Sequence, residues 1–592
     1  MKPTAQLLED RLTNAMQKAS GLENCAAMLK PTTDPKFGDY QANGVMAVAK
    51  QLKTNPRQLA EKVVEQLDVS DMCEMPEVAG PGFINLRLKP EFIAKRLLEI
   101  NADTSERLSV IKVQDPKTIV LDFSGPNIAK QMHVGHLRST IIGDAICRLL
   151  EFQGHNVVRQ NHIGDWGTQF GMLCALYDKI LLEAPKGEAI CRDETLADIE
   201  GFYREAQHLY KTDEEFAKTS RAAVVGLHTG EGVWVTYWER IVTTTSKHFL
   251  EIYDRLGVSL EDKHTRGESF YSDKLQNVVD DLKAKGLAVE SDGAMCVFSP
   301  GFKNKEGQDL PLIVQKSDGA FLYATTDLAA IRYRVSELGA KKIIYVTDAR
   351  QSLHFEMVFA VARMADWVPD DVELVHVTFG SVLGEDSKPL KTRSGENVKL
   401  KELLDEAVIR AKAVVEQKNP ELPQAKKEEI AAAVGVGAVK YADYTNNRTS
   451  DYIFSFDKML AMEGNTAPYM QYAYARVKSI ERKALEKAVD AIGELAAIKS
   501  ISLTEPAEIE LAKQLARYDE AIISAASDFR PNYLTAYLFD LAGKFSSFYT
   551  QCPVLTAEPS KRPTRLLLCD LTAKTIRHGL STLLGITVVE QM

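Results

Sequence analysis

The stretch that most constrains the fold runs from residue 118 to residue 164, where two strand-like runs flank a helical one. The first run, TIVLDFS at 118–124, is short and rich in β-branched residues, as is typical of a strand buried in a parallel sheet. The second, NVVRQNHIG, occupies 156–164. The apolar helical pattern between them ends at Gly154, a common helix terminator. This β–loop–α–β succession predicts a doubly wound, Rossmann-like parallel sheet.

Two histidines and a glycine stand at the start of the predicted helix, in the motif HVGH at 133–136. Two histidines at this spacing are able to ligate zinc, but a catalytic zinc site needs further ligands, and the HExxH form is absent. The turn from a strand into a helix favours phosphate, because free backbone N–H groups and the helix dipole attract anions there. Gly135 allows a close approach of backbone or adenine. Structural histidines near a helix cap are the alternative.

Length and composition bound the class of protein. With 592 residues, 45% hydrophobic and 26% charged, the sequence is typical of an ordinary globular protein of several domains. Its eight cysteines form no CxxC pair, which indicates free thiols in a reducing cytosol rather than a zinc ribbon. The N-terminal residues do not resemble a signal peptide, and no apolar run reaches the roughly 18 residues of a membrane span. We therefore expect a cytoplasmic protein without a membrane partner.

Changes of pattern divide this multidomain α/β chain into four predicted parts. Residues 1–112 indicate a small N-terminal α+β domain, and residues 113–400 a Rossmann-type domain. A charged helical insertion is expected at about 178–265, with the sheet completed beyond it by the runs AMCVFS, LPLIVQ, KKIIYVT and VELVHVTF. Helical patterns continue to the end, with 401–454 as a connector and 455–592 as an all-α domain.

Six motifs, in order along the chain, resemble one family. HVGH, taken with the distant Lys/Ser/Arg loop SKPLKTRSG at 387–395, resembles the paired HIGH and KMSKS signatures with which the class I aminoacyl-tRNA synthetases bind ATP. Within that class the chain is similar to the arginyl-tRNA synthetases. The motifs that carry the resemblance are FSGPNIAKQMHVGHLRST, NHIGDWGTQFGML, YATTDLAAI, DARQSLHFEM, LKTRSGENVKL and APYMQYAYARV.

The resemblance implies a two-step reaction. L-arginine attacks the α-phosphate of ATP to give arginyl-adenylate and pyrophosphate, and the 3′ end of tRNA-Arg then takes the arginine. Positioning and positive charge around the phosphates are the main catalytic needs. Mg²⁺ is expected to arrive with ATP, held by phosphates and water, so no set of protein ligands for a metal is predicted. The family expectation is a monomer whose C-terminal helical domain binds the anticodon.

The resemblance also implies which residues serve ATP. The two histidines contact the phosphates and stabilise the transition state. At the KMSKS position the chain has KTRSG, in which one lysine of the signature is doubtful; a lysine just before HVGH is expected to supply the missing charge. The alternative for this loop is a solvated basic loop. The implied ATP-binding and catalytic residues are His133, Gly135, His136, His354, Lys391, Arg393 and Lys130.

Recognition of arginine calls for carboxylates, because a planar guanidinium pairs with them fork to fork. Asp122, at the end of the first strand, and Asp327, in YATTD, match the family's positions, with Tyr323 as an accompanying wall. Asn127 and Gln351 match its contacts to the α-amino group and the carboxylate. An N-cap in front of the following helical run is the alternative for the second aspartate, and the two roles are compatible.

A tRNA partner is expected despite the net charge of −10. Residues 530–592 contain seven Lys or Arg and four Asp or Glu, so this region has a net charge of +3. Aromatic and basic residues recur at helical spacing in APYMQYAYARV, which suits stacking on bases; packing in a helical core is the alternative. A pocket lined by carboxylates makes editing unnecessary, so the insertion is expected to support the acceptor stem. The implied tRNA-binding residues are Tyr40, Gln41, Asn43, Tyr469, Tyr472 and Arg476.

Two other classes of protein remain open on the sequence alone. A small HxGH nucleotidylyltransferase explains the phosphate motif but neither the later basic loop nor the helices after residue 400. A tRNA-binding regulator that has lost catalysis explains the scaffold, but it has no need for both histidines together with Lys391. Turnover of ATP separates these hypotheses.

Overall fold

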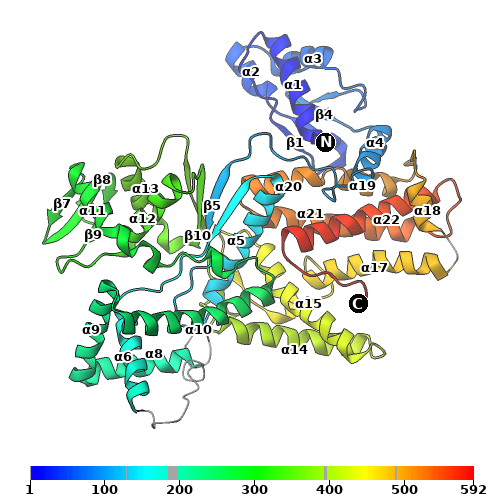
Figure 1. The fold of residues 1–592 in the computed structure, drawn as a ribbon. Helices are drawn as coiled ribbons and strands as arrows, with labels where there is room; N and C mark the ends of the chain where they lie inside the picture. Colours follow the sequence, from blue (N-terminus) through cyan, green and yellow to red (C-terminus); the bar gives the residue numbers. More distant parts are fainter. Residues whose placement is uncertain (1, 129, 184–197, 392–396, 487–489) are drawn as a thin grey trace. The chain divides into compact units, whose positions relative to one another are not determined.

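The computed structural model describes residues 2–128, 130–183, 198–391, 397–486 and 490–592 (Figure 1). The chain divides into two compact units. One contains residues 1–112, 462–582 and 588–592, and the other contains residues 113–461 and 583–587. The two ends of the sequence therefore belong to the same unit. Within the described ranges, no helix combines the length and the apolar character that a membrane crossing requires.

A four-stranded parallel sheet forms the centre of the larger unit. Its order is β11-β10-β5-β6, with β5 at Thr118–Asp122, β6 at Asn156–Gln160, β10 at Lys342–Asp348 and β11 at Glu373–Phe379. From β5 the chain passes through α5 (Val134–Gln153) into β6, while β10 pairs with the other edge of β5. Doubly wound sheets bind ligands at such a reversal, beyond the carboxyl ends of the strands. The expected Rossmann-like sheet is confirmed.

Two of the runs expected in this sheet lie elsewhere. β8 (Ala294–Lys303) and β9 (Asp309–Gln315) pair with β7 (Ala288–Ser291) in a separate antiparallel sheet. The prediction that AMCVFS and LPLIVQ complete the parallel sheet is therefore wrong, whereas KKIIYVT and VELVHVTF do form β10 and β11. Buried and exposed residues mix along β8 and β9, as expected for a sheet with one solvated face, while β10 has four consecutive buried residues.

Helices cover the sheet and extend the unit (Figure 1). A hydrophobic core joins the sheet to α11 (Leu275–Ala284), α12 (Tyr323–Ser336) and α13 (Ser352–Met364). The helix α6 (Thr168–Glu183) leads into the insertion expected at about 178–265. It packs against α8 (Ile199–Thr212), α9 (Glu214–Thr229) and α10 (Gly232–Leu256), which lie within the insertion. α14 (Leu400–Lys418) and α15 (Gln424–Tyr444) pack against each other after the sheet.

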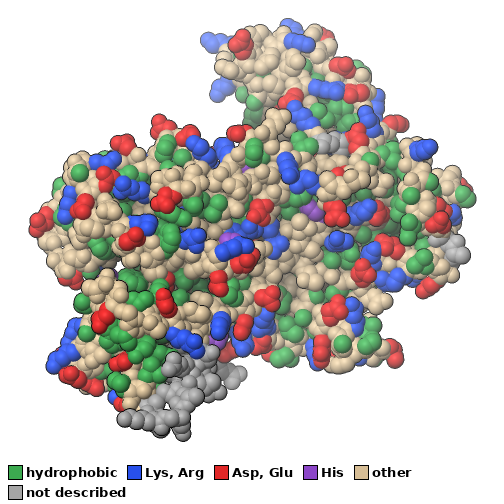
Figure 2. Space-filling model, viewed as in Figure 1, with side chains coloured by type: hydrophobic (Ala, Val, Ile, Leu, Met, Phe, Trp, Pro, Cys, Tyr) green, Lys and Arg blue, Asp and Glu red, His purple; other side chains and the backbone are tan. Residues whose placement is uncertain are grey.

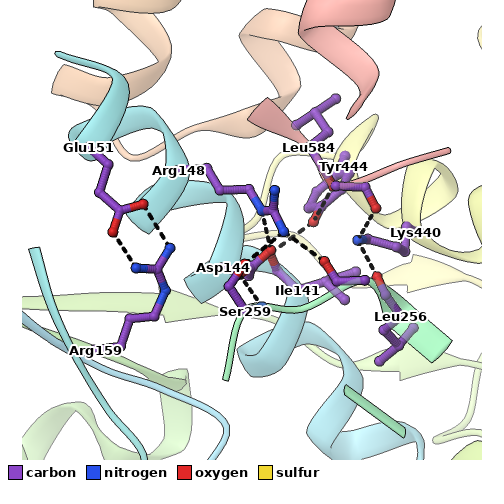
Figure 3. Close-up of polar contacts among 12 residues, drawn as sticks. Ile141, Asp144, Arg148, Glu151, Arg159, Leu256, Ser259, Lys440, Tyr444 and Leu584 are labelled. Atoms are coloured by element: carbon purple, nitrogen blue, oxygen red, sulfur yellow. Dashed lines mark hydrogen bonds and ion pairs between the residues drawn. The ribbon is translucent and has the colours of Figure 1, made fainter. Parts of the chain in front are cut away.

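Buried polar contacts hold α5 in place (Figure 3). Asp144 and Arg148, one turn apart on α5, form an ion pair of 2.6 Å, and Asp144 also accepts a hydrogen bond of 2.9 Å from the backbone of Ser259. From α15, the Tyr444 hydroxyl donates to the Ile141 carbonyl of α5 at 2.9 Å. Because α5 begins with HVGH, these contacts position the helix that carries the phosphate motif.

The smaller unit combines an α+β part and a helical part. The α+β part has a four-stranded antiparallel sheet, in the order β1-β2-β4-β3. Its elements are α1 (Thr4–Ser20), β1 (Leu29–Pro31), β2 (Tyr40–Ala42), α2 (Val45–Leu52), α3 (Pro56–Gln66), β3 (Glu77–Ala79), β4 (Phe83–Leu86) and α4 (Pro90–Asn101). The helical part contains α17 (Ala467–Glu486), α18 (Ala491–Ala496), α19 (Pro506–Leu515), α20 (Tyr518–Ser527), α21 (Pro531–Gln551) and α22 (Arg562–Arg577).

Candidate active site

The two histidines of HVGH cap the helix that they begin. His133 is the N-cap of α5, and its Nδ1 accepts a hydrogen bond of 3.0 Å from the Gly135 backbone. Nδ1 of His136 accepts the backbone N–H of His133 at 3.1 Å. Because each Nδ1 accepts a backbone proton, the ring proton of each neutral imidazole lies on Nε2. The capping role and a role as donor to a ligand therefore belong to opposite sides of the same rings.

Both imidazoles are neutral at pH 7. Burial lowers the pKa of His136 to about 3. Burial also lowers the pKa of His133, and the positive charge of Lys130 adds to that effect. The rings, 4.0 Å apart, thus offer neutral N–H donors rather than charge. The exposed Lys130 is the cation beside them, at the end of α5 where backbone N–H groups also favour an anion.

The basic loop is tied to HVGH through the backbone. Segments 132–134 and 398–400 pair through two hydrogen bonds of 2.9 Å. Within the loop, Lys391 is exposed and forms a backbone bridge with Asn397. Arg393 lies outside the described residues. Two motifs far apart in the sequence are therefore anchored at the same end of α5, as a divided phosphate site requires.

Asp122 is paired with a guanidinium of the protein itself. Its Oδ2 accepts a hydrogen bond of 2.6 Å from Arg334, whose side chain is fully buried. Arg334 also donates to Gln160 at 2.6 Å. One oxygen of Asp122 is therefore occupied by a residue of the protein, and the expected contact of Asp122 with arginine stays a prediction. Its partner lies 212 residues further along the chain, so no local pattern reveals the pair.

Asp327 forms a direct pair with His354. Nε2 of His354 lies 2.6 Å from Oδ2 of Asp327, and both side chains are partly exposed. The helix α12 begins at Tyr323 and has Leu322 as its N-cap, so Asp327 lies inside the helix and the N-cap alternative is wrong. His354, expected near adenosine, contacts a carboxylate expected to bind arginine, and its own contact with adenosine stays a prediction.

A third acid of this region, Glu268, is absent from the residues implied by the sequence. It opens the short helix η3 (Glu268–Lys274). Burial, together with the negative charges of Asp165 and Asp327, raises the pKa of Glu268 to about 8. Burial and the charge of Glu268 also raise the pKa of Tyr323. Glu268 is thus electrostatically coupled to both Asp327 and Tyr323, and a group of acids of this kind suits a cationic ligand. The only sequence signal is an acid in RGESFY directly after the insertion.

Two of the remaining expected substrate residues lie beyond the carboxyl ends of adjacent strands, and the third, Tyr323, begins α12. Asn127, after β5, and Gln351, after β10, are exposed, as is Tyr323, at 74%. Asn127 forms a parallel backbone bridge with Gly164. A Cβ at Gly164 would lie 2.2 Å from Oδ1 of Asn127, so glycine is needed for this approach. The reversal point of the sheet therefore carries the exposed polar side chains.

The smaller unit holds the residues expected to contact tRNA, and three of them lie on α17. Tyr472 is 42% exposed. Tyr469 packs against Phe539 with ring centroids 5.8 Å apart, and Arg476 lies 4.5 Å above the ring of Tyr549. Of these three residues of α17, Tyr469 and Arg476 therefore pack against other aromatic rings, whereas the ring of Tyr472 is exposed.

The expected contacts in the α+β part differ in exposure. Tyr40 is fully buried, and its hydroxyl donates to Glu520 at 2.6 Å, which corrects the expectation that this side chain contacts bases. Gln41 and Asn43 are partly exposed, and Gln41 donates to Asn85 at 2.8 Å.

The basic excess of residues 530–592 is largely offset by ion pairs. Five of the seven bases pair with acids, and four of these acids lie outside that range. The pairs are Lys544–Glu510, Lys561–Glu505, Arg562–Glu494, Arg565–Glu508 and Lys574–Asp570. Figure 2 shows Lys and Arg interspersed with Asp and Glu on the face in view. The count along the sequence therefore overstates the positive charge of this region.

The parallel sheet reverses beside β5, the HxGH motif begins the helix that follows, and the residues after the basic loop are anchored next to that motif. Together these features define a class I aminoacyl-tRNA synthetase. Three family models match the chain: "tRNA synthetases class I (R), catalytic domain" at residues 100–456, "DALR anticodon binding domain" at 470–592 and "Arginyl tRNA synthetase N terminal domain" at 6–88. The chain belongs to the arginyl-tRNA synthetase family.

Similar proteins cover the chain from end to end. Arginine–tRNA ligases of Synechococcus elongatus and Hahella chejuensis are each 50% identical to it, over 100% and 99% of both chains respectively. The crystal structure of arginyl-tRNA synthetase from Plasmodium falciparum matches with a TM-score of 0.83 and 30% identity, covering 100% of both chains. The Thermus thermophilus enzyme matches with a TM-score of 0.80 and 26% identity over the same coverage.

Proposed function

We propose that this chain joins L-arginine to tRNA-Arg by forming arginyl-adenylate from ATP and then transferring the arginine to the 3′ end of the tRNA. The observation that carries the proposal is the pairing of the residues after the basic loop with the HVGH segment, in which both histidines use Nδ1 for capping and keep the Nε2 proton for a ligand. Catalysis then consists of holding ATP and stabilising the charge that develops on its phosphates.

ATP is held at the start of α5. His133 and His136 donate their Nε2 protons to phosphate oxygens, and adenine packs over Gly135. Because both imidazoles are neutral, the positive charge must come from other groups. We assign that role to Lys130 and Lys391, together with Arg393. Mg²⁺ enters with ATP, bound by phosphates and water.

Arginine is held by acids of α12 and η3. Asp327 and Glu268 receive the guanidinium, with Tyr323 as a wall, because these three groups are electrostatically coupled and one carboxyl has a pKa of about 8. Asn127 and Gln351 contact the α-amino group and the carboxylate from the ends of β5 and β10. His354 acts through Asp327, to which it is hydrogen-bonded.

tRNA binding rests on the smaller unit and the insertion. We propose that residues 455–592 bind the anticodon, with Tyr472 as an exposed stacking surface, and that residues 1–112 bind the tRNA corner through Gln41 and Asn43. Helices at 178–265 support the acceptor stem, and residues 401–454 connect the Rossmann-type part at 113–400 to the anticodon-binding part. The protein acts in the cytoplasm as a monomer.

The deciding experiment measures pyrophosphate release from ATP with each of the 20 amino acids, with and without tRNA. We expect turnover with arginine only, and only when tRNA is present. Activity with another amino acid, or no charging of any tRNA, would contradict the proposal. Release of pyrophosphate onto a small acceptor without tRNA would favour a nucleotidylyltransferase.

A pair of variants tests the arginine site. Asp327→Ala should raise the KM for arginine far more than the KM for ATP, since it removes a guanidinium ligand. Asp327→Asn, which keeps the shape and one acceptor, should lie between the wild type and the alanine variant. Equal losses for both substrates would make the aspartate a structural residue.

A further inference from the structure

Asp165 is a buried residue whose two carboxylate oxygens both accept hydrogen bonds from the same neighbour. The residue is 3% exposed. Its Oδ1 accepts the Ser269 backbone N–H at 2.9 Å, and its Oδ2 accepts the Ser269 hydroxyl at 2.6 Å. Ser269 follows Glu268 directly in the chain. Asp165 therefore fixes the backbone next to the acid that we assign to the guanidinium.

Further contacts hold the same turn. The Glu268 backbone N–H donates to the Ile163 carbonyl at 3.1 Å, and the nearby backbone of Trp166 lowers the pKa of the Glu268 carboxyl. A Cβ on Gly267 would lie 2.2 Å from Oδ2 of Asp165, so only glycine allows the carboxylate to come this close. Segment 163–166 and the start of η3 are thus held together by several hydrogen bonds.

The insertion reaches this structure from the other side. Trp238, in α10, donates its Nε1 proton to the backbone carbonyl of Asp165 at 2.7 Å. The helix α10 therefore contacts the segment that carries Asp165, and Asp165 contacts the turn that carries Glu268. A residue of the insertion is in this way linked to the arginine site by two successive hydrogen bonds.

We infer that Asp165 is a positioning residue for arginine: it orients Glu268 through Ser269 and, by its negative charge, strengthens the site for a guanidinium. This inference rests on the proposed role of Glu268. The charged and titratable groups that face Glu268 are Asp165, Asp327 and Tyr323. A neutral residue at 165 removes one of the two acids that oppose ionisation of Glu268. The position thus has a geometric effect and an electrostatic effect that are separable by mutation.

Three variants of the full-length chain separate these effects. Asp165→Ala removes both hydrogen bonds and the charge. Asp165→Asn keeps an acceptor for the Ser269 backbone but removes the charge, and Ser269→Ala removes only the hydroxyl contact. The control is Glu261→Gln, which neutralises an exposed acid seven residues before Glu268. For each protein, the KM for arginine and the KM for ATP are measured in aminoacylation between pH 6.5 and 9, and thermal unfolding is recorded.

We expect Asp165→Ala to raise the KM for arginine by about 10- to 100-fold, since a small displacement of a binding group has effects of that order, while the KM for ATP changes less than about twofold. Ser269→Ala should raise the KM for arginine by about threefold. In Asp165→Asn, the rise of kcat/KM for arginine with pH should move to lower pH, because Glu268 ionises more easily. Glu261→Gln should match the wild type.

Several results would overturn the inference. One is an unchanged KM for arginine in both Ser269→Ala and Asp165→Ala. Another is an equal rise in the KM values of both substrates, and a third is a pH profile of Asp165→Asn identical to that of the wild type. If Asp165→Ala does not fold, the other two variants carry the test. A wild-type protein that does not charge arginine would contradict the proposed function itself. Normal charging that is lost in Glu268→Gln but insensitive to changes at Asp165 and Ser269 would contradict only this inference.

Discussion

Nε2 of His354 lies 2.6 Å from Oδ2 of Asp327, so a histidine of α13 holds a carboxylate of α12. Both side chains are partly exposed. A carboxylate accepts hydrogen bonds only, so the ring nitrogen donates. The contact holds one oxygen of Asp327, so the histidine sets the orientation of the carboxylate. His354 therefore contacts the carboxylate that we propose as a ligand of arginine.

Replacement of His354 tests that assignment. His354→Ala should raise the KM for arginine by about tenfold, because loss of a hydrogen bond to a charged group costs about 1.5 kcal/mol. His354→Gln, which keeps an N–H donor, should recover part of the affinity. A larger effect on the KM for ATP than on that for arginine would instead support the adenosine contact expected from the sequence.

The raised pKa of Glu268 predicts a pH dependence of arginine binding. Because the pKa is about 8, the carboxyl of the free protein is mostly protonated at pH 7 and must lose its proton to pair with a guanidinium. Binding should therefore strengthen as the pH rises from 7 towards 9 and should release a proton at pH 7. Calorimetry of arginine binding in buffers of different ionisation enthalpy measures that proton. In Glu268→Gln the proton release should vanish, and its persistence would point to another group.

Capping and catalysis by His133 should separate in an asparagine variant. Asn is a good N-cap and offers an oxygen to the Gly135 backbone, but it lacks the Nε2 donor. His133→Asn should thus unfold near the wild-type temperature while adenylate formation falls by about 10²- to 10³-fold, the usual cost of losing one donor to a developing charge. His133→Leu should lose the activity and about 1 kcal/mol of stability as well. Retained activity in the asparagine variant would exclude phosphate stabilisation by this ring.

The buried pair of Asp122 and Arg334 predicts an effect on stability. Arg334→Leu leaves an uncompensated buried carboxylate and should lower the free energy of unfolding by about 3–5 kcal/mol. The double variant Asp122→Leu/Arg334→Leu should recover part of that loss, since no charge is then left unpaired. Denaturant unfolding of the three proteins checks this. If Arg334→Leu is stable but binds arginine more weakly, Asp122 belongs to the substrate site after all.

Two tyrosines of the smaller unit should differ in their effect on tRNA. Tyr472→Ala removes an exposed ring and should raise the KM for tRNA by about tenfold, in line with about 1–3 kcal/mol for base stacking on an aromatic side chain. Tyr40→Phe removes a buried hydrogen bond to Glu520 and should lower stability by about 1–3 kcal/mol without changing the KM for tRNA. A tRNA defect in Tyr40→Phe, at unchanged stability, would contradict this division.

Local patterns in the sequence were enough to predict the start of the fold. β-branched residues at 118–122, the helical period that ends at Gly154 and the run at 156–160 all became the expected elements. The position of HVGH at a helix N-terminus follows from these same neighbours. Such features depend on contacts within a few residues along the chain, and this is why periodicity and turn residues reveal them.

The strands after the insertion show where such patterns stop being sufficient. Runs in β8 and β10 are both apolar, yet β8 joins an antiparallel sheet and β10 joins β5. Their own residues favour strands but do not select the partner, which depends on the packing of helices on each face. A similar limit applies to charge: the bases of residues 530–592 are offset by acids from other helices.

What the sequence determined by itself was the phosphate motif, the order of elements around it and the family to which the six motifs belong. The tertiary structure alone decided which partners the candidate site residues have. Asp122 is occupied by Arg334, Tyr40 is buried against Glu520, and Glu268 comes beside Asp327 from a distant turn. The physical reason is that burial and ionic pairing depend on distances in space, whereas helix and strand propensities depend on neighbours in the chain.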